Sequence, residues 1–185
     1  MAGALIRIIK GIPNPSIPDR TVEDVQDDMQ KKKAQDLSTK NDFLNNMSQL
    51  ESSGGENTDH DTMDSGIHAG QHAVGQYGLM PNTVDEMANR MESDNTAPYE
   101  IHMLKVAKTP PQQQADLISQ NPDLEKAIAD KLYNHVNQKY NGDQDKMDYA
   151  WKMGHNLPST SITIEKLDNS DRAQKFKALK DKLNK

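Results

Sequence analysis

Apolar side chains recur three and four residues apart along most of the chain, and this spacing predicts a mainly helical protein. The stretches with helical spacing lie at about residues 21–37, 38–51, 83–91, 98–104, 121–141, 147–154 and 173–183. Between the second and third stretches, residues 54–82 are rich in Gly, Asn, Asp and His, which predicts loops that include a small hairpin. The alternation at 161–164 predicts one further strand. We therefore expect an α-helical fold with little sheet.

The N-terminal region differs from the remainder in pattern. Residues 1–20 hold a short apolar run followed by three prolines, which predicts an extended arm and linker. Residues 21–37 are highly charged, and only Val22, Val25 and Met29 form a thin apolar stripe. This stripe belongs either to a solvated helix or to a helix that docks on a partner. We expect three regions: an N-terminal arm and docking helix at 1–37, the main domain at 38–158 and a C-terminal helical extension at 159–185.

The amino-acid composition and net charge argue against several classes of function. The chain has 185 residues, 34% of them hydrophobic, and a formal net charge of −6, so it suits one small core and argues against binding to nucleic acid phosphates. No apolar run is long enough for a membrane span, and Arg7 and Lys10 interrupt the N-terminal run, which does not fit a secretory signal. Without cysteine there is neither a disulfide nor a thiolate zinc site.

Glu51 is the first candidate for chemistry. It falls on the apolar side of the last turn of its predicted helix, just before a Ser-Ser-Gly-Gly stop signal. The chain between Lys40 and Arg90 carries eight acidic residues but no Lys or Arg. Neighbouring carboxylates, partial burial and the helix C-terminus all disfavour an ionised Glu51, so we expect it to hold a proton near neutral pH, as a general acid does. The plainer alternative is an ordinary Glu at a helix end.

Two segments together carry a resemblance to a known family. The first is Glu-Ser-Ser-Gly-Gly at 51–55, and the second is Ala-Val-Gly-Gln-Tyr-Gly-Leu-Met-Pro-Asn-Thr at 73–83. Over about residues 40–157 the chain resembles the soluble lytic transglycosylase and goose-type lysozyme family, particularly its phage-borne members. The resemblance implies a lysozyme-like fold in which Glu51 is the sole catalytic acid/base and Ser52 its neighbour.

The resemblance also implies the residues that line the sugar cleft. The family's second motif, Gly-Leu-Met-Gln-x-Met-Pro-x-Thr, is shortened here and lacks its Gln in either alignment, so Gln76 or Asn82 would have to replace it. The third motif, Ala-Tyr-Asn-x-Gly, corresponds to 150–154, where Trp151 replaces Tyr and can stack on a sugar or donate a hydrogen bond. The expected substrate-binding residues are Ser52, Gln76, Tyr77, Gly78, Leu79, Met80, Asn82, Tyr149 and Trp151.

The implied reaction is cleavage of the β-1,4 bond between N-acetylmuramic acid and N-acetylglucosamine in peptidoglycan. A transglycosylase needs only Glu51 and forms a 1,6-anhydro ring. A hydrolytic muramidase needs a second carboxylate, for which the candidates are Asp59, Asp61 and Asp64. No cofactor is expected.

Three histidines invite a metal interpretation, but the sequence disfavours it. His60, His68 and His72 lie near acidic residues, and the last two are four residues apart, a ligand spacing on a helix. Gly66 and Gly70 make a helix there unlikely, so we expect loop histidines and no metal.

The regions outside the cleavage domain indicate partners. Since the arm and the 21–37 helix are not needed for cleavage, we expect them to attach the protein to other virion or tail proteins of a phage particle. The expected location is thus the virion, acting on peptidoglycan strands of the bacterial cell wall. The alternative is a virion structural protein that keeps the lysozyme-like fold with weak or no activity.

Overall fold

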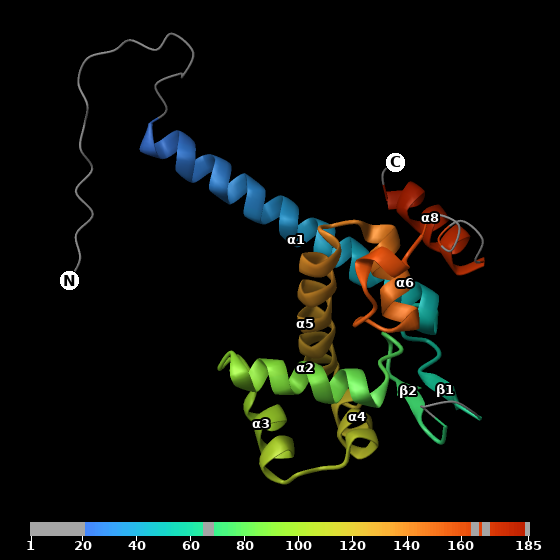
Figure 1. Cartoon of the computed structure of the whole chain (residues 1–185). Coiled ribbons are helices and arrows are strands. Elements are labelled where there is room, and N and C mark those ends of the chain that lie inside the picture. The colour runs from blue at the N-terminus through green and yellow to red at the C-terminus, as the bar shows by residue number, and fades with distance from the viewer. Residues whose placement is uncertain (1–20, 65–68, 164–166, 168–170, 184–185) are drawn as a thin grey trace, which may run out of the picture. The chain divides into compact units, whose positions relative to one another are not determined.

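A computed structural model describes residues 21–64, 69–163, 167 and 171–183. Of these residues 70% are helical, and they form seven α-helices and one two-stranded sheet, which confirms the mainly α class (Figure 1). The helices are α1 (Val22–Ser52), α2 (Pro81–Ser93), α3 (Tyr99–Val106), α4 (Pro111–Ser119), α5 (Pro122–Tyr140), α6 (Gln144–Met153) and α8 (Asp171–Leu183). The strands are β1 (Asp59–Thr62) and β2 (His72–Val74), and a short 3-10 helix covers Ser159–Ser161. The expected arm at 1–20 lies outside the described residues.

The chain divides into two units, Met1–Leu37 and Ser38–Lys185. The described residues of the first unit are an exposed helix that begins with a capping box, in which Thr21 and Asp24 exchange hydrogen bonds through backbone N–H and side chain. A new helix start at Ser38 was the wrong prediction, because α1 continues without a break through this position. The residues around Ser38 include Lys, Gln, Leu and Ala, which favour a helix. Their propensity outweighs the weaker helix propensity of one Ser and one Thr, so the helix continues.

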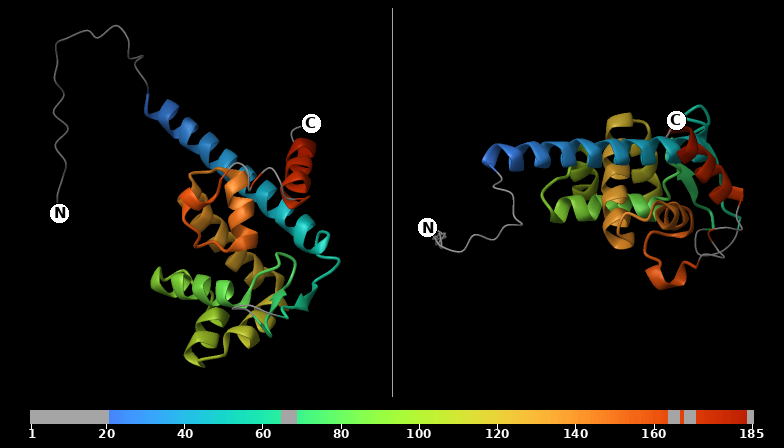
Figure 2. Two further views of the ribbon diagram at one scale, coloured as in Figure 1. Left: turned by 45° about the vertical axis from the view of Figure 1, so that its right-hand side comes forward. Right: turned by 90° about the horizontal axis from the view of Figure 1, so that it is seen from above.

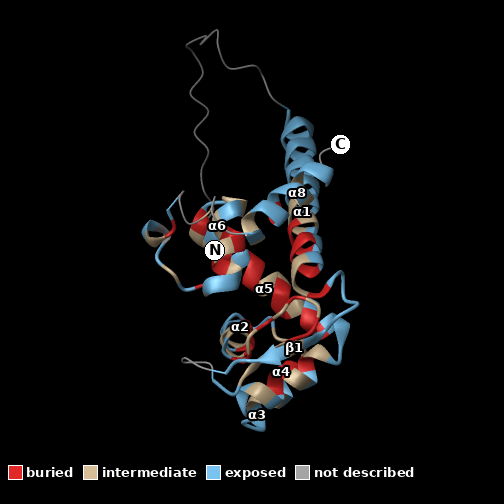
Figure 3. Ribbon diagram, turned by 90° about the vertical axis from the view of Figure 1, so that its right-hand side faces the viewer, coloured by how far each residue is buried: buried red, intermediate tan, exposed pale blue. Residues whose placement is uncertain are grey.

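An aromatic cluster around Phe43 of α1 forms part of the core of the second unit. Its ring lies 5.4 Å from that of Tyr133 and 5.7 Å from each of Trp151 and Phe176, measured between centroids. These contacts bring α5, α6 and α8 against α1, and α5 carries an almost continuous buried face (Figure 3). Phe176 belongs to the expected C-terminal extension, so that helix completes the core of this unit.

Helix α5 confirms its sequence signals. The side chain of Asn121 accepts hydrogen bonds from the backbone N–H groups of Asp123 and Leu124, with Pro122 as the first helical residue. Asn141 ends the helix in the left-handed conformation. One other expectation fails: the described part of the 161–164 segment is a 3-10 turn followed by irregular chain instead of a strand. The sequence pattern also gave no sign of α4.

The expected hairpin is present. β1 and β2 pair antiparallel, with Asp59 opposite Val74 and Thr62 opposite His72. The chain leaves β2 in a tight turn, Gly75–Gly78, which we call the glycine turn; it is closed by two backbone hydrogen bonds of 3.0 Å between Val74 and Leu79. Both views of Figure 2 show the hairpin following directly on the C-terminal end of α1. The two segments that carry the family resemblance are therefore neighbours in space.

In the ranges that the structure describes, no helix combines the length and the apolar character that a membrane crossing requires.

Candidate active site

Glu51 lies in the last turn of α1, with only 11% of its side chain exposed. Its Oε1 atom is 2.7 Å from Nη1 of Arg172, which projects from the first turn of α8. On its other side the carboxyl faces Gly78, where a Cβ atom would lie 2.8 Å from Oε2. Gly78 has φ +58°, so both its backbone conformation and its missing side chain allow this approach. The carboxyl is therefore enclosed on two sides.

Two side chains from different helices hold the carbonyl groups of the glycine turn. Ser52 is buried, and its hydroxyl lies 2.8 Å from the Gln76 carbonyl oxygen and accepts a hydrogen bond from the Gly55 N–H. The indole N–H of Trp151 donates to the Tyr77 carbonyl oxygen at 3.1 Å. The residue after Glu51 and the expected third motif thus both fix the turn that lies against Glu51.

Glu125 of α5 also contacts the glycine turn. Its carboxyl is buried and accepts the backbone N–H of Tyr77 at 3.1 Å, and a Cβ atom on Gly75 would overlap it. Burial raises the pKa of Glu125, although the N–H groups of Tyr77 and Gln76 and the charge of His60 act in the opposite direction. We assign this carboxyl to the support of the turn. Sequence analysis missed it, since its position beside Leu124 on α5 gives no sign of a partner 48 residues away.

Arg172 joins Glu51 to a second carboxyl, that of Asp148 on α6. Nε of Arg172 donates to Oδ1 of Asp148 at 2.8 Å, and the Asp148 side chain is only 4% exposed. The pKa of Asp148 is raised to about 6, chiefly by burial and also by the negative charges of Glu51 and Asp145, which together outweigh the lowering by Arg172. Two carboxyls therefore share one guanidinium. Neither Asp148 nor Arg172 was a sequence candidate, because both lie far along the chain from Glu51.

The remaining residues that were expected to bind substrate differ in how far their side chains are exposed. The side chains of Tyr77 and Leu79 are in the core, at 6% and 1% exposure. Trp151 packs edge-on against Phe43 and uses its N–H within the protein. Among the others, Gln76, Met80 and Tyr149 are partly exposed, and Asn82 is exposed in the first turn of α2. Tyr149 also packs against the core, so Gln76, Met80 and Asn82 are the expected binding residues whose side chains have neither a core role nor a part in fixing the turn described above.

The acidic and histidine residues of the hairpin have other surroundings. Asp59, Asp61 and Asp64 are exposed on or beside β1, whereas the carboxyl beside Arg172 and Glu51 is that of Asp148. Nε2 of His60 lies 2.8 Å from the Gly75 carbonyl oxygen, and that of His72 lies 3.2 Å from the Asp116 carboxylate. His68 falls outside the described residues. Within the described ranges, no group of three or more His, Asp or Glu is arranged to hold a metal ion.

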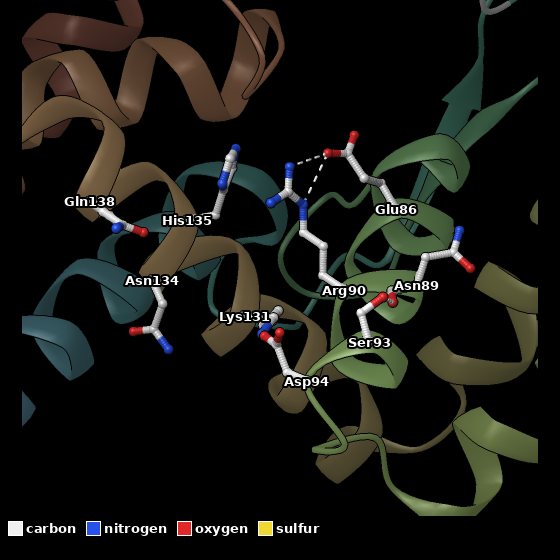
Figure 4. Close-up of a pocket in the computed structure, with 9 residues that line it drawn as sticks. All are labelled: Glu86, Asn89, Arg90, Ser93, Asp94, Lys131, Asn134, His135 and Gln138. Atoms are coloured by element: carbon white, nitrogen blue, oxygen red, sulfur yellow. Dashed lines mark hydrogen bonds and ion pairs between the residues drawn. The ribbon is translucent and has the colours of Figure 1, made fainter.

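A polar cavity of about 510 Å³ lies between α2 and α5 (Figure 4). It is lined by Glu86, Asn89, Arg90, Ser93, Asp94, Lys131, Asn134, His135 and Gln138. Burial raises the pKa of Glu86, but hydrogen bonds from His155, Arg90 and Asn156 outweigh this and bring it to about 2. None of the expected site residues lines this cavity.

Comparison of the chain with protein-family models, with curated proteins and with solved structures found no match.

Proposed function

We propose that this protein is a peptidoglycan lytic transglycosylase in which Glu51 is the single acid/base. The observation that supports the proposal is the contact between the two segments that carry the family resemblance. The Glu51 carboxyl lies against Gly78, and Ser52 is hydrogen bonded to Gln76. A carboxyl that is mostly buried beside a backbone turn, with 11% of its side chain exposed, has the placement that a proton donor to a bound sugar needs.

The proposed reaction uses one carboxyl twice. Glu51 first gives its proton to the oxygen of the β-1,4 bond between N-acetylmuramic acid and N-acetylglucosamine, and that bond breaks. The resulting carboxylate then takes the proton of the muramic 6-hydroxyl, whose oxygen bonds to C1 and closes the 1,6-anhydro ring. Glu51 is again protonated, and no cofactor or water is consumed.

The remainder of the proposal concerns location. We place the protein in a phage particle, where it would open the cell wall during entry and contact other virion or tail proteins through residues 1–37. The helical part of that region exposes Val22, Val25 and Met29, a stripe that suits a protein partner. A chain without residues 1–36 is expected to be absent from purified particles, and its normal incorporation would contradict this docking role.

A second candidate is a virion structural protein with a lysozyme-like fold and weak or no activity. The observation that favours it is the ion pair of Glu51 with Arg172, since it occupies the carboxyl with a structural partner. The core positions of Tyr77 and Leu79 point the same way, because they remove two expected binding side chains from the surface.

The test is incubation of the full chain with purified peptidoglycan sacculi, followed by mass analysis of the soluble products. The transglycosylase predicts anhydro-muropeptides. Reducing products, heavier by one water or about 18 Da, would mean a hydrolytic muramidase instead. Absence of soluble products across the pH range would contradict both enzymes and leave the structural role.

A further inference from the structure

We infer that Arg172 is the positioning residue that fixes the Glu51 carboxyl and sets how strongly it holds its proton, in competition with Asp148. The inference deepens the proposed function and depends on it for the meaning of that proton in catalysis. The electrostatic coupling among the three side chains can be measured whether or not the protein is an enzyme.

The geometry uses all three nitrogen atoms of the guanidinium. Nη1 contacts Oε1 of Glu51 at 2.7 Å, Nε contacts Oδ1 of Asp148 at 2.8 Å, and Nη2 lies 3.6 Å from the sulfur of Met47. Only 18% of the Arg172 side chain is exposed. A planar group held at three points has little freedom to turn, so the Glu51 carboxyl is fixed in direction.

Helix α8 holds Arg172 in place independently of the two carboxyls. One turn along the helix, Phe176 is buried against Phe43. A further turn along, Lys180 pairs with Asp145 of α6 at 2.9 Å. The cation beside Glu51 is therefore anchored in the core.

The charges of this cluster do not balance when both carboxyls are ionised. One guanidinium then faces two carboxylates, Glu51 and Asp148, and burial makes the excess negative charge costly. Asp145, the next acidic group on α6, has its own partner in Lys180. The two buried carboxyls consequently compete for Arg172. An ionised Asp148 weakens the pairing of Glu51 with the cation and so favours the protonated form of Glu51, the form that begins the proposed reaction.

Two substitutions should shift the pH at which the Glu51 carboxyl loses its proton, and they should shift it in opposite directions. Arg172→Met removes the cation, so Glu51 should keep its proton to a pH higher by about one unit. Asp148→Asn removes the competing carboxylate, so Glu51 becomes the single charged partner of Arg172 in this cluster. Glu51 should then lose its proton at a pH lower by a similar amount. A merely structural role would weaken folding in both variants without opposite shifts. Lys175→Met removes an exposed cation of the same helix and serves as the matched control.

The experiment is a carbon-13 NMR titration of glutamate carboxyls in the full chain, with Glu51 assigned by its loss in Glu51→Gln. The expected result is a midpoint that rises in Arg172→Met, falls in Asp148→Asn and stays unchanged in Lys175→Met. Should Arg172→Met fail to fold, the fall in Asp148→Asn still tests the competition. Unchanged midpoints, or shifts of both variants in one direction, would overturn the inference.

A second readout separates this inference from the proposed function. If sacculi are cleaved, the alkaline limb of the pH–rate profile should move with the NMR midpoint in each variant, and a limb that stays fixed would remove the catalytic meaning of the coupling. If sacculi are not cleaved but the midpoints move oppositely, the proposed function fails and the charge coupling stands.

Discussion

At the scale of the residue, two glycines decide how closely the glycine turn approaches two carboxyls. Gly75 and Gly78 both have positive φ, and each faces a carboxyl group where a side chain would stand, that of Glu125 and that of Glu51. Glycine is the residue that tolerates both conditions at once. The turn is consequently wedged between a supporting carboxyl and the proposed catalytic one.

Replacement of Gly75 by Ala should be strongly destabilising. Left-handed backbone costs about 1–2 kcal/mol for a residue with a Cβ atom, and the overlap with the buried Glu125 carboxyl adds about 1–3 kcal/mol. Urea denaturation should therefore show a loss of about 2–5 kcal/mol in the free energy of unfolding.

Gly70→Ala is the matched control for this prediction. Gly70 also has positive φ, +79°, but among the described residues a Cβ atom there would meet nothing within 4 Å. Its loss should be limited to about 1–2 kcal/mol of backbone strain. Equal losses in the two variants would mean that the contact with Glu125 does not hold the turn.

The candidate site was only partly predictable at this scale. Glu51 was identifiable because a charged residue occupies an apolar position next to a helix stop. Arg172 and Asp148 were not, since each looks like an ordinary polar residue of a helix and their meeting depends on how α6 and α8 pack on α1. Long-range partners of this kind leave no local pattern in a sequence.

At the scale of the element, local signals decided which helices were predictable. Helix α5 has an Asn cap, Pro at its first position and an apolar residue at nearly every fourth position, and its bounds were close to those expected. The sequence did not predict α4, because its buried face includes Gln114 beside Ala115 and Ile118 and is more polar than the usual face of a core helix. Tertiary packing supplies what its pattern lacks.

Helix α8 should depend on Phe176 for its attachment. Phe176→Ala removes a fully buried ring that contacts Phe43, so we expect a loss of about 3–5 kcal/mol in the free energy of unfolding by urea denaturation. Lys177→Ala, at the exposed neighbouring position, should change it by less than about 0.5 kcal/mol. A small effect of Phe176→Ala would show that α8 is not part of the folded core.

At the scale of the whole molecule, two carboxyls give stability a defined dependence on pH. The pKa of Asp148 is raised to about 6 by burial, so the folded state holds this proton more tightly than the unfolded state. The contribution of the Asp148 proton to the free energy of unfolding is fully present below about pH 4 and is lost as the pH rises through about 6. Glu86, with its pKa lowered to about 2, contributes above about pH 4.5 and loses this contribution as the pH falls.

Asp148→Asn should therefore change the slope of stability against pH. Urea denaturation of the wild type between pH 4 and pH 6 should show the contribution of Asp148 as a decline, and the variant should lack that decline because Asn does not titrate. Asp61→Asn, an exposed position on β1, is the control and should keep the wild-type slope. The same slope in Asp148→Asn and wild type would contradict the assignment.

The central claim for the molecule is that the Glu51 carboxyl performs the chemistry, and paired variants test it most directly. Glu51→Gln keeps the shape of the side chain but removes the proton, whereas Glu56→Gln makes the same change at an exposed position five residues later. The measurement is the rate of release of anhydro-muropeptides from sacculi. The account predicts a loss of about 100-fold or more in Glu51→Gln and a wild-type rate in Glu56→Gln. Equal rates in the two variants would contradict it.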